Sequence, residues 1–203
     1  LLKKKIALKN TLTKLLVFGE KRLNGYKDRW QSKFFHELLD YEQPNKYISN
    51  KKKFYSHGII PVLTANKSFV LGYTNEKKFV FNSLPVIIFD DFTTDMKFVS
   101  FPFKVRSSAL KILKPTIKNI DMYFMYNLMR NTKISNKEHK RYWISDYQYK
   151  KILIPKYDEQ KKISEIIFSA QKEIDHIEKK INKLEKIKYS VTDYLFTDPK
   201  RLI

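Results

Sequence analysis

The sequence contains no cysteine, which excludes disulfides and thiolate metal sites. Its 4 glycines leave no glycine-rich phosphate loop, and its 4 histidines lack the spacing of metal ligands. No apolar run approaches the roughly 18–20 residues of a membrane span. No signal peptide leads the chain, so we expect a cytoplasmic protein without a membrane partner. These absences exclude several enzyme classes and favour a binding protein.

Acidic residues are also scarce. The chain has 41 Lys and Arg against 21 Asp and Glu, a net charge of +20. Residues 1–24 carry a net +6, residues 25–155 a net +12 and residues 156–203 only +2. The alternative, a lysine-rich composition that reflects an AT-rich genome, explains part of the lysine content but not the shortage of acids. The excess charge therefore predicts a nucleic-acid partner for the middle segment.

The C-terminal segment has the pattern of a long helix. Residues 161–196 contain neither Gly nor Pro. Apolar residues alternate there at spacings of four and three, and after an interruption at Lys188 they continue. About 36 residues at 1.5 Å each predict a helix of roughly 54 Å. These apolar residues form a narrow stripe along the helix, here called the seam, which should pack against another helix. The seam consists of Ile163, Ile167, Ala170, Ile174, Ile177, Ile181, Leu184, Val191 and Leu195.

The two ends of the chain are similar to each other. Residues 5–23 align without a gap on residues 184–202, so that Lys21-Arg22-Leu23 matches Lys200-Arg201-Leu202. Chance similarity between lysine-rich helix ends is the alternative. We interpret the match as an internal repeat that brackets one globular segment.

The segment between the helices is predicted to be a mixed α/β (α+β) domain. Short β-branched and aromatic runs predict strands at 58–64, 69–74, 78–82, 85–91 and 97–105, and residues 149–156 are predicted to form a strand leading into the long helix. Residues 108–113 fit a strand or a turn of helix. Residues 120–132 predict a helix whose aromatic stripe belongs to the core. Residues 30–39 read as a short amphipathic stretch, and 40–47 and 133–145 as loops.

Two adjacent carboxylates, Asp90 and Asp91, interrupt the apolar run at 86–103. A metal nuclease needs carboxylates that converge from different elements. Adjacent residues on a strand point to opposite sides, and only three residues separate Asp91 from Asp95. The pair therefore fits turn capping, DNA contact or both better than catalysis, and no metal site is predicted.

Three segments resemble those of Type I restriction–modification specificity subunits. Pro155, Glu159, Gln160 and Ile163 match a Pro-x-x-x-Glu-Gln-x-x-Ile motif at the start of that family's conserved helix. Residues 8–30 resemble the end of its central helix, and residues 58–113, with the block Phe-Asp-Asp-Phe-Thr-Thr at 89–94, resemble a target-recognition domain. The resemblance covers essentially the whole chain and corresponds to the second half of a subunit.

The resemblance implies a division into three parts: 1–24 as the tail of the central helix, 25–155 as the target-recognition domain and 156–203 as the conserved helix. It implies a non-catalytic protein that reads half of a split double-stranded DNA target. Methyltransferase and restriction subunits are the implied partners, with S-adenosylmethionine and ATP bound by those partners. The seam would pair with the other half of the subunit or with a second copy. Alternatives are a free-standing DNA-binding regulator that dimerises through its coiled coil, and the recognition region of a single-chain restriction–methylation enzyme.

Polar side chains in loops and at strand ends are the candidate DNA contacts, because base edges require rigidly held donors and acceptors. The candidates for base contact are Thr64, Asn66, Lys67, Asp90, Asp91, Thr93 and Thr94. The candidates for phosphate contact are Lys51, Lys52, Lys53, Arg106, Ser107, Lys133, Lys137, Lys140 and Arg141.

Overall fold

The computed structural model of the chain describes residues 1–64, 68–134 and 141–197. The predicted contact residues Asn66, Lys67, Lys137 and Lys140, and the side chain of Leu195, lie outside what it describes. The helices are α1 (Leu2–Val17), α2 (Phe35–Leu38), η1 (Pro44–Tyr47), α3 (Met122–Asn131), α4 (Tyr142–Ser145), η2 (Tyr147–Tyr149) and α5 (Tyr157–Thr197). The strands are β1 (Gln31–Phe34), β2 (Leu39–Glu42), β3 (Ile60–Leu63), β4 (Val70–Thr74), β5 (Val86–Asp90), β6 (Met96–Val99), β7 (Lys104–Val105), β8 (Leu110–Pro115) and β9 (Lys151–Ile154).

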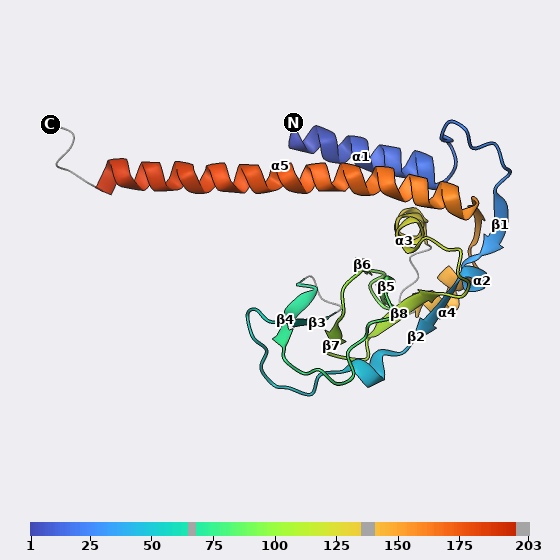
Figure 1. The fold of residues 1–203 in the computed structure, drawn as a ribbon, viewed down its shortest axis with the longest axis horizontal. Helices are drawn as coiled ribbons and strands as arrows, with labels where there is room; N and C mark the ends of the chain where they lie inside the picture. Colours follow the sequence, from blue (N-terminus) through green and yellow to red (C-terminus); the bar gives the residue numbers. More distant parts are fainter. Residues whose placement is uncertain (65–67, 135–140, 198–203) are drawn as a thin grey trace.

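A long helix crosses the molecule, with a mixed α/β domain below one of its halves (Figure 1). Helix α5 has 41 residues, and α1 lies along its first half in the opposite direction. The Lys9 ammonium donates to Gln171 at 2.8 Å, and Lys5 pairs with Glu173 one turn further along. The predicted α+β domain with a long C-terminal helix is confirmed.

The main sheet has the strand order β2-β8-β5-β6, and all its pairings are antiparallel. All five residues of β5 are buried, as expected for an apolar strand inside the domain. Because β2 and β5 both run opposite to β8, their C-terminal ends lie at the same edge as the start of β8. The register places Glu42 opposite Ile112 and Asp90 opposite Leu110. This edge brings three separate loops together.

A second sheet has the order β4-β3-β7, and the basic loop at 51–53 is joined to it on both sides, by bridges from Ile48 to Val105 and from Tyr55 to Tyr73. Gly72 in β4 makes room for this loop, because a Cβ there would lie 2.7 Å from Cβ of Phe54 and 2.9 Å from the Tyr55 carbonyl. Tyr55 and Tyr73 exchange backbone hydrogen bonds of 2.9 Å across this close approach. The glycine therefore allows the segment that follows the three lysines to pack closely on β4.

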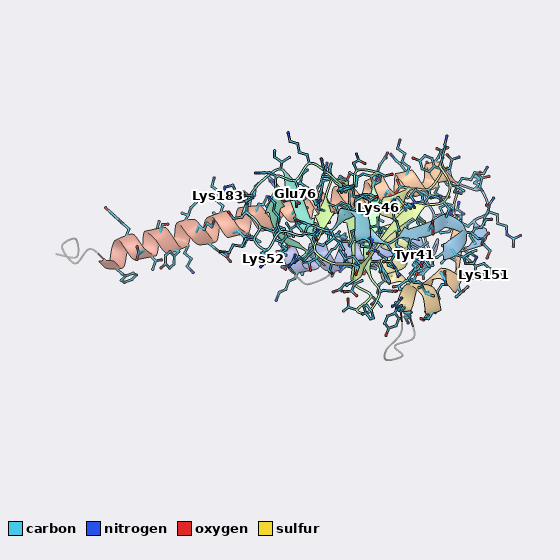
Figure 2. All side chains as sticks on the ribbon, turned by 90° about the horizontal axis from the view of Figure 1, so that it is seen from below. Tyr41, Lys46, Lys52, Glu76, Lys151 and Lys183 are labelled. Carbon is cyan, nitrogen blue, oxygen red and sulfur yellow. The ribbon has the colours of Figure 1, made fainter. Side chains whose placement is uncertain are left out.

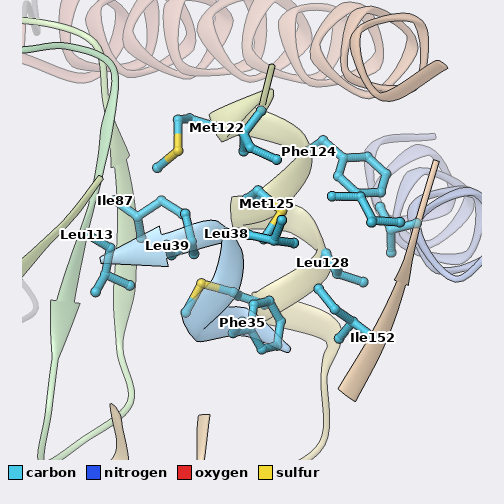
Figure 3. Packing of buried hydrophobic residues seen from close by; sticks show 14 of the residues in the cluster. Phe35, Leu38, Leu39, Ile87, Leu113, Met122, Phe124, Met125, Leu128 and Ile152 are labelled. Atoms are coloured by element: carbon cyan, nitrogen blue, oxygen red, sulfur yellow. The ribbon is translucent and has the colours of Figure 1, made fainter. Parts of the chain in front are cut away.

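The core lies between the main sheet, α3 and the start of α5 (Figure 3). Phe124, Met125 and Leu128 of α3 are buried in the same cluster as Ile87 and Leu113 of the sheet, with Leu128 beside Ile152 of β9. The prediction that the aromatic and methionine stripe of α3 belongs to the core is confirmed. Asp121 caps this helix by accepting a 2.7 Å hydrogen bond from the Phe124 amide.

Several local predictions are wrong. Residues 78–82 form no strand: Phe81 makes one isolated bridge to Phe103, and Phe79 has a left-handed φ of 54°. The predicted strand at 97–105 is divided into β6 and β7. The stretch at 30–39 contains β1, α2 and the start of β2, and the predicted loop at 133–145 ends in α4. In each case, contacts distant in sequence decide the structure, such as the pairing of β1 with β9.

Candidate nucleic-acid interface

Asp90 ends β5 and organises the turn that follows it. One of its carboxylate oxygens accepts hydrogen bonds from the amides of Phe92 and Thr93, at 2.8 and 3.1 Å. Thr94 has a left-handed φ of 63° and donates its amide to the Asp90 carbonyl at 3.0 Å. The predicted turn capping is confirmed for Asp90. It leaves Phe92 and Thr93 exposed at the tip of the turn.

Asp91 is 3 % exposed and connects the sheet to α4. One carboxylate oxygen accepts from the Trp143 amide at 2.7 Å, and the Asp91 carbonyl accepts from the Tyr142 amide at 3.0 Å. The other carboxylate oxygen lies 3.4 Å from the ammonium of Lys111, which is also buried. That ammonium lies 4.1 Å from the centre of the Tyr41 ring. With both oxygens engaged inside the protein, Asp91 is suited to positioning its neighbours rather than to accepting from a base.

A polar cavity of about 230 Å³ opens at this edge of the sheet. Loops after β2 and β5, the turn before β8 and the residue before α4 all contribute to its wall. The lining residues are Gln43, Asn45, Asp91, Phe92, Ser108, Ala109, Lys111 and Arg141. Of these, sequence reasoning proposed only Asp91 and Arg141. It missed the others because it read 40–47 as a plain loop and could not foresee that β2 and β5 end side by side.

Basic residues flank this cavity. The guanidinium of Arg106 lies within 3.4 Å of the carbonyl oxygens of Ser49 and Lys51, and stacks 5.7 Å from the Phe54 ring. It thereby holds the loop that presents exposed Lys51, Lys52 and Lys53. Arg106 is connected to the cavity wall through the chain, because only Ser107 separates it from the lining residue Ser108.

Glu76 holds the start of the same loop through Ser49. Its carboxylate accepts hydrogen bonds from the hydroxyls of Ser49 and Thr74. The hydrogen bond from Ser49 is the main reason that the pKa of Glu76 lies below its ordinary value of 4.5. The positive charges of Lys104 and Lys51 lower this pKa further.

Cavity and basic loop both belong to the part of the domain turned away from α5. Figure 2 views the molecule from that direction and labels Tyr41, Lys46 and Lys52. In Figure 1 the η1 segment, which contains Lys46, lies at the end of the domain farthest from α5. Among the other predicted contact residues, Thr64 is buried and Lys133 is exposed just beyond α3, and neither lines the cavity.

The seam of α5 is covered over only half its length. Ile163, Ile167 and Ile174 are buried, in the half along which α1 lies. Leu184 is 64 % exposed and Val191 is 51 % exposed, beyond the end of α1. The remaining seam positions Ala170, Ile177 and Ile181 are partly buried. An exposed apolar stripe on a regular helix suits a helical partner.

Two adjacent residues near the start of α5 join the helix to the rest of the chain. Glu159 accepts from Arg22 and from the Trp30 indole, which lie beyond the end of α1. Gln160 accepts from the Asp121 amide at 3.0 Å and donates to the Pro155 carbonyl at 2.9 Å. Glu159 and Gln160 therefore hold α1 and α5 against the domain, which explains the structural role of the motif at 155–163.

Within the described residues, no three His, Cys, Asp or Glu side chains are grouped as metal ligands would be. No helix in that part of the chain is long and apolar enough to cross a membrane.

No protein-family model matches the chain. Over 142 residues, 67 % of its length, it is 43 % identical to the Type I restriction enzyme EcoR124I/EcoR124II specificity subunit of Escherichia coli. The chain is a homologue of Type I specificity subunits. It spans 34 % of the E. coli subunit, and specificity subunits are the non-catalytic components of their enzymes.

Solved structures agree on the fold of this specificity-subunit homologue. The S subunit of the Type I restriction–modification system from M. genitalium aligns with 97 % of the chain at a TM-score of 0.64, with 14 % identity. The HsdS subunit from Thermoanaerobacter tengcongensis aligns with 96 % of it at a TM-score of 0.52, also with 14 % identity. The chain covers 55 % and 51 % of those two proteins, about half of each.

Proposed function

We propose that the chain is the DNA-reading part of a Type I specificity subunit, with residues 25–155 as its target-recognition domain. It would read half of a split duplex target in the cytoplasm. The observation that carries the proposal is the polar cavity at a rigid sheet edge, flanked by Lys51–Lys53 and Arg106 on a domain of net charge +12. Such an arrangement suits phosphate contacts that position a protein around side chains that read bases.

Helix α5 would hold this domain at a fixed distance from a second recognition domain. Its uncovered stripe, which includes Leu184 and Val191, would pair with the other half of the subunit or with a second copy. The helix would also dock methyltransferase subunits, with which restriction subunits associate. S-adenosylmethionine and ATP would be bound by those partners, and this chain would have no catalytic activity.

Binding of duplex DNA measured by fluorescence anisotropy at increasing salt tests the proposal. If the chain makes six to ten phosphate contacts, its affinity for DNA should fall by a factor of about 10³–10⁵ when the salt concentration is raised from 50 to 200 mM. A shallow slope, or no binding at low salt, would contradict it. Incubation of plasmid with the chain and Mg²⁺ or Mn²⁺ should produce no nicking. If the wild-type chain nicks plasmid and the variant with both Asp90 and Asp91 changed to Asn does not, the chain is a metal-dependent nuclease.

The alternatives are separated by the genomic neighbourhood. An adjacent methyltransferase gene favours the specificity subunit, whereas a lone gene favours a free-standing regulator. A single reading frame that continues into methyltransferase and nuclease motifs would favour a single-chain enzyme.

A further inference from the structure

The cavity at the end of the main sheet is too small for most cofactors. Its volume of about 230 Å³ lies below the roughly 300–1,000 Å³ of typical small-molecule sites. Its wall carries two amides, a hydroxyl, a guanidinium and an ammonium, from Gln43, Asn45, Ser108, Arg141 and Lys111. A cavity of this size and polarity suits one edge of a planar, hydrogen-bonding group.

The groups at the rim have hydrogen-bonding capacity to spare. Gln43, Asn45 and Arg141 are exposed, and in the described part of the chain no residue hydrogen-bonds to their side-chain amide or guanidinium groups. Deeper in the wall, the three-donor ammonium of Lys111 has one carboxylate oxygen of Asp91 at 3.4 Å and the face of Tyr41 as its neighbours among the described residues. These donors and acceptors are therefore available to a ligand.

The backbone that carries these groups is held rigidly. Gln43 directly follows β2, which is paired with β8 from Leu39 to Glu42. Arg141 directly precedes Tyr142 and Trp143, whose amides both donate to Asp91. Asp91 in turn follows the fully buried strand β5. Base readout requires such fixed positions, because a misplaced donor loses its discrimination.

Together these observations identify the chemistry of the ligand. Arg and Lys pair with O6 and N7 of guanine in the major groove, and Asn and Gln pair with N6 and N7 of adenine. These four residue types therefore match purine edges. A carboxylate would match the cytosine amino group, but both oxygens of Asp91, the carboxylate in this wall, are already engaged by Trp143 and Lys111.

We infer that this cavity reads the major-groove edge of a purine, with Asn45 and Arg141 in direct contact and Asp91 as the residue that positions Arg141. The inference rests on the proposed DNA-reading function and adds the site that determines specificity. Exposed Lys51–Lys53, beyond Arg106, would contact phosphates on one side of this cavity.

The test first selects the preferred duplex of the full-length chain from a randomised pool, and then measures its affinity for single-base variants of that duplex. Asn45→Ala and Arg141→Ala should each reduce the preference for one purine roughly tenfold or more. Asn45→Ala should leave the salt slope unchanged because it removes no charge. Lys52→Ala should weaken binding to all sequences equally and reduce the slope by about one. Asn119→Ala, an exposed asparagine beside the start of α5, should change neither quantity.

Unchanged unfolding midpoints would show that the exposed positions 45 and 141 have been altered without damage to the fold. Variants that keep the wild-type preference at every position, or lose affinity evenly, would overturn the inference and leave the proposed function intact. A wild-type chain that prefers no sequence would overturn both.

Discussion

The carboxylate of Glu159, near the start of α5, accepts hydrogen bonds from Nε and Nη2 of Arg22 at 2.7 and 2.8 Å. The Glu159 side chain is 2 % exposed, and the guanidinium also stacks 5.3 Å from the Trp30 ring. Gly19, with a φ of 69°, makes room for that ring. These contacts connect the end of one helix with the start of the other.

Replacing Arg22 with Leu should therefore destabilise the chain by about 2–4 kcal/mol, because it leaves a buried carboxylate without its charged partner. Arg22 is 31 % exposed, which keeps the loss below that of a fully buried pair. The free energy of unfolding in urea measures the effect. Glu173→Gln removes the more exposed pair with Lys5 and should cost about 1 kcal/mol or less. Equal losses of unfolding free energy in the two variants would show that the buried Arg22–Glu159 pair stabilises the chain no more than the exposed Lys5–Glu173 pair.

The two adjacent carboxylates should respond differently to the same substitution. Asp90→Asn keeps an oxygen that can accept from the Phe92 and Thr93 amides, so it should cost about 1 kcal/mol or less. Asp91→Asn leaves the Lys111 ammonium buried without an opposite charge and should cost about 3 kcal/mol. Urea unfolding compares the two.

A second substitution separates charge from shape at Asp91. Lys111→Met in the Asp91→Asn background should recover part of the lost stability, because it removes the unpaired ammonium. If the two changes are simply additive, the pair is not coupled as the structure indicates.

Glu76 should make the basic loop sensitive to acid. Its pKa is lowered in the folded chain by the hydrogen bond from Ser49, so its contribution is complete above its ordinary pKa of 4.5. The contribution is lost as pH falls through the lowered folded-state value. Glu76→Gln should therefore be less stable than wild type at pH 7, and the difference should shrink below about pH 4.5. Urea midpoints at several pH values measure it; a difference independent of pH would exclude the carboxylate as its source.

The uncovered half of the α5 seam should mediate self-association. We expect an antiparallel pair of chains with a recognition domain at each end, and Leu184→Asp with Val191→Asp should give monomers. Both positions are more than half exposed in the single chain, so the fold should survive. Ile174→Asp with Ile181→Asp should also disrupt pairing, but Ile174 is already buried along α1 and its loss should destabilise the chain as well.

Light scattering at tens of micromolar chain measures the association. Asn182→Asp with Ser190→Asp adds the same charge outside the seam and should leave it unchanged. If the wild-type chain is monomeric, the homodimer prediction is wrong, and the stripe would instead pair with another part of a specificity subunit or with methyltransferase subunits, as proposed above.

Periodic features of the molecule were predictable from sequence, and contacts between distant segments were not. The spacing from Ile163 to Leu184 determines a helix because it depends on local geometry alone. The apolar stripe at 120–132 likewise predicts a buried helix. By contrast, Gln43 and Asn45 acquire their position only when β2 pairs with β8 beside β5, and no local pattern encodes that edge. Asp91 shows the same limit, since its partner Trp143 lies 52 residues away.

Selection of bound duplexes from a randomised pool tests the central claim most directly. A DNA-reading half of a specificity subunit should enrich one short motif of a few base pairs, and the enriched duplex should bind more tightly than a scrambled one at the same salt concentration. Enrichment of no motif, with equal affinity for both duplexes, would contradict sequence recognition by this chain.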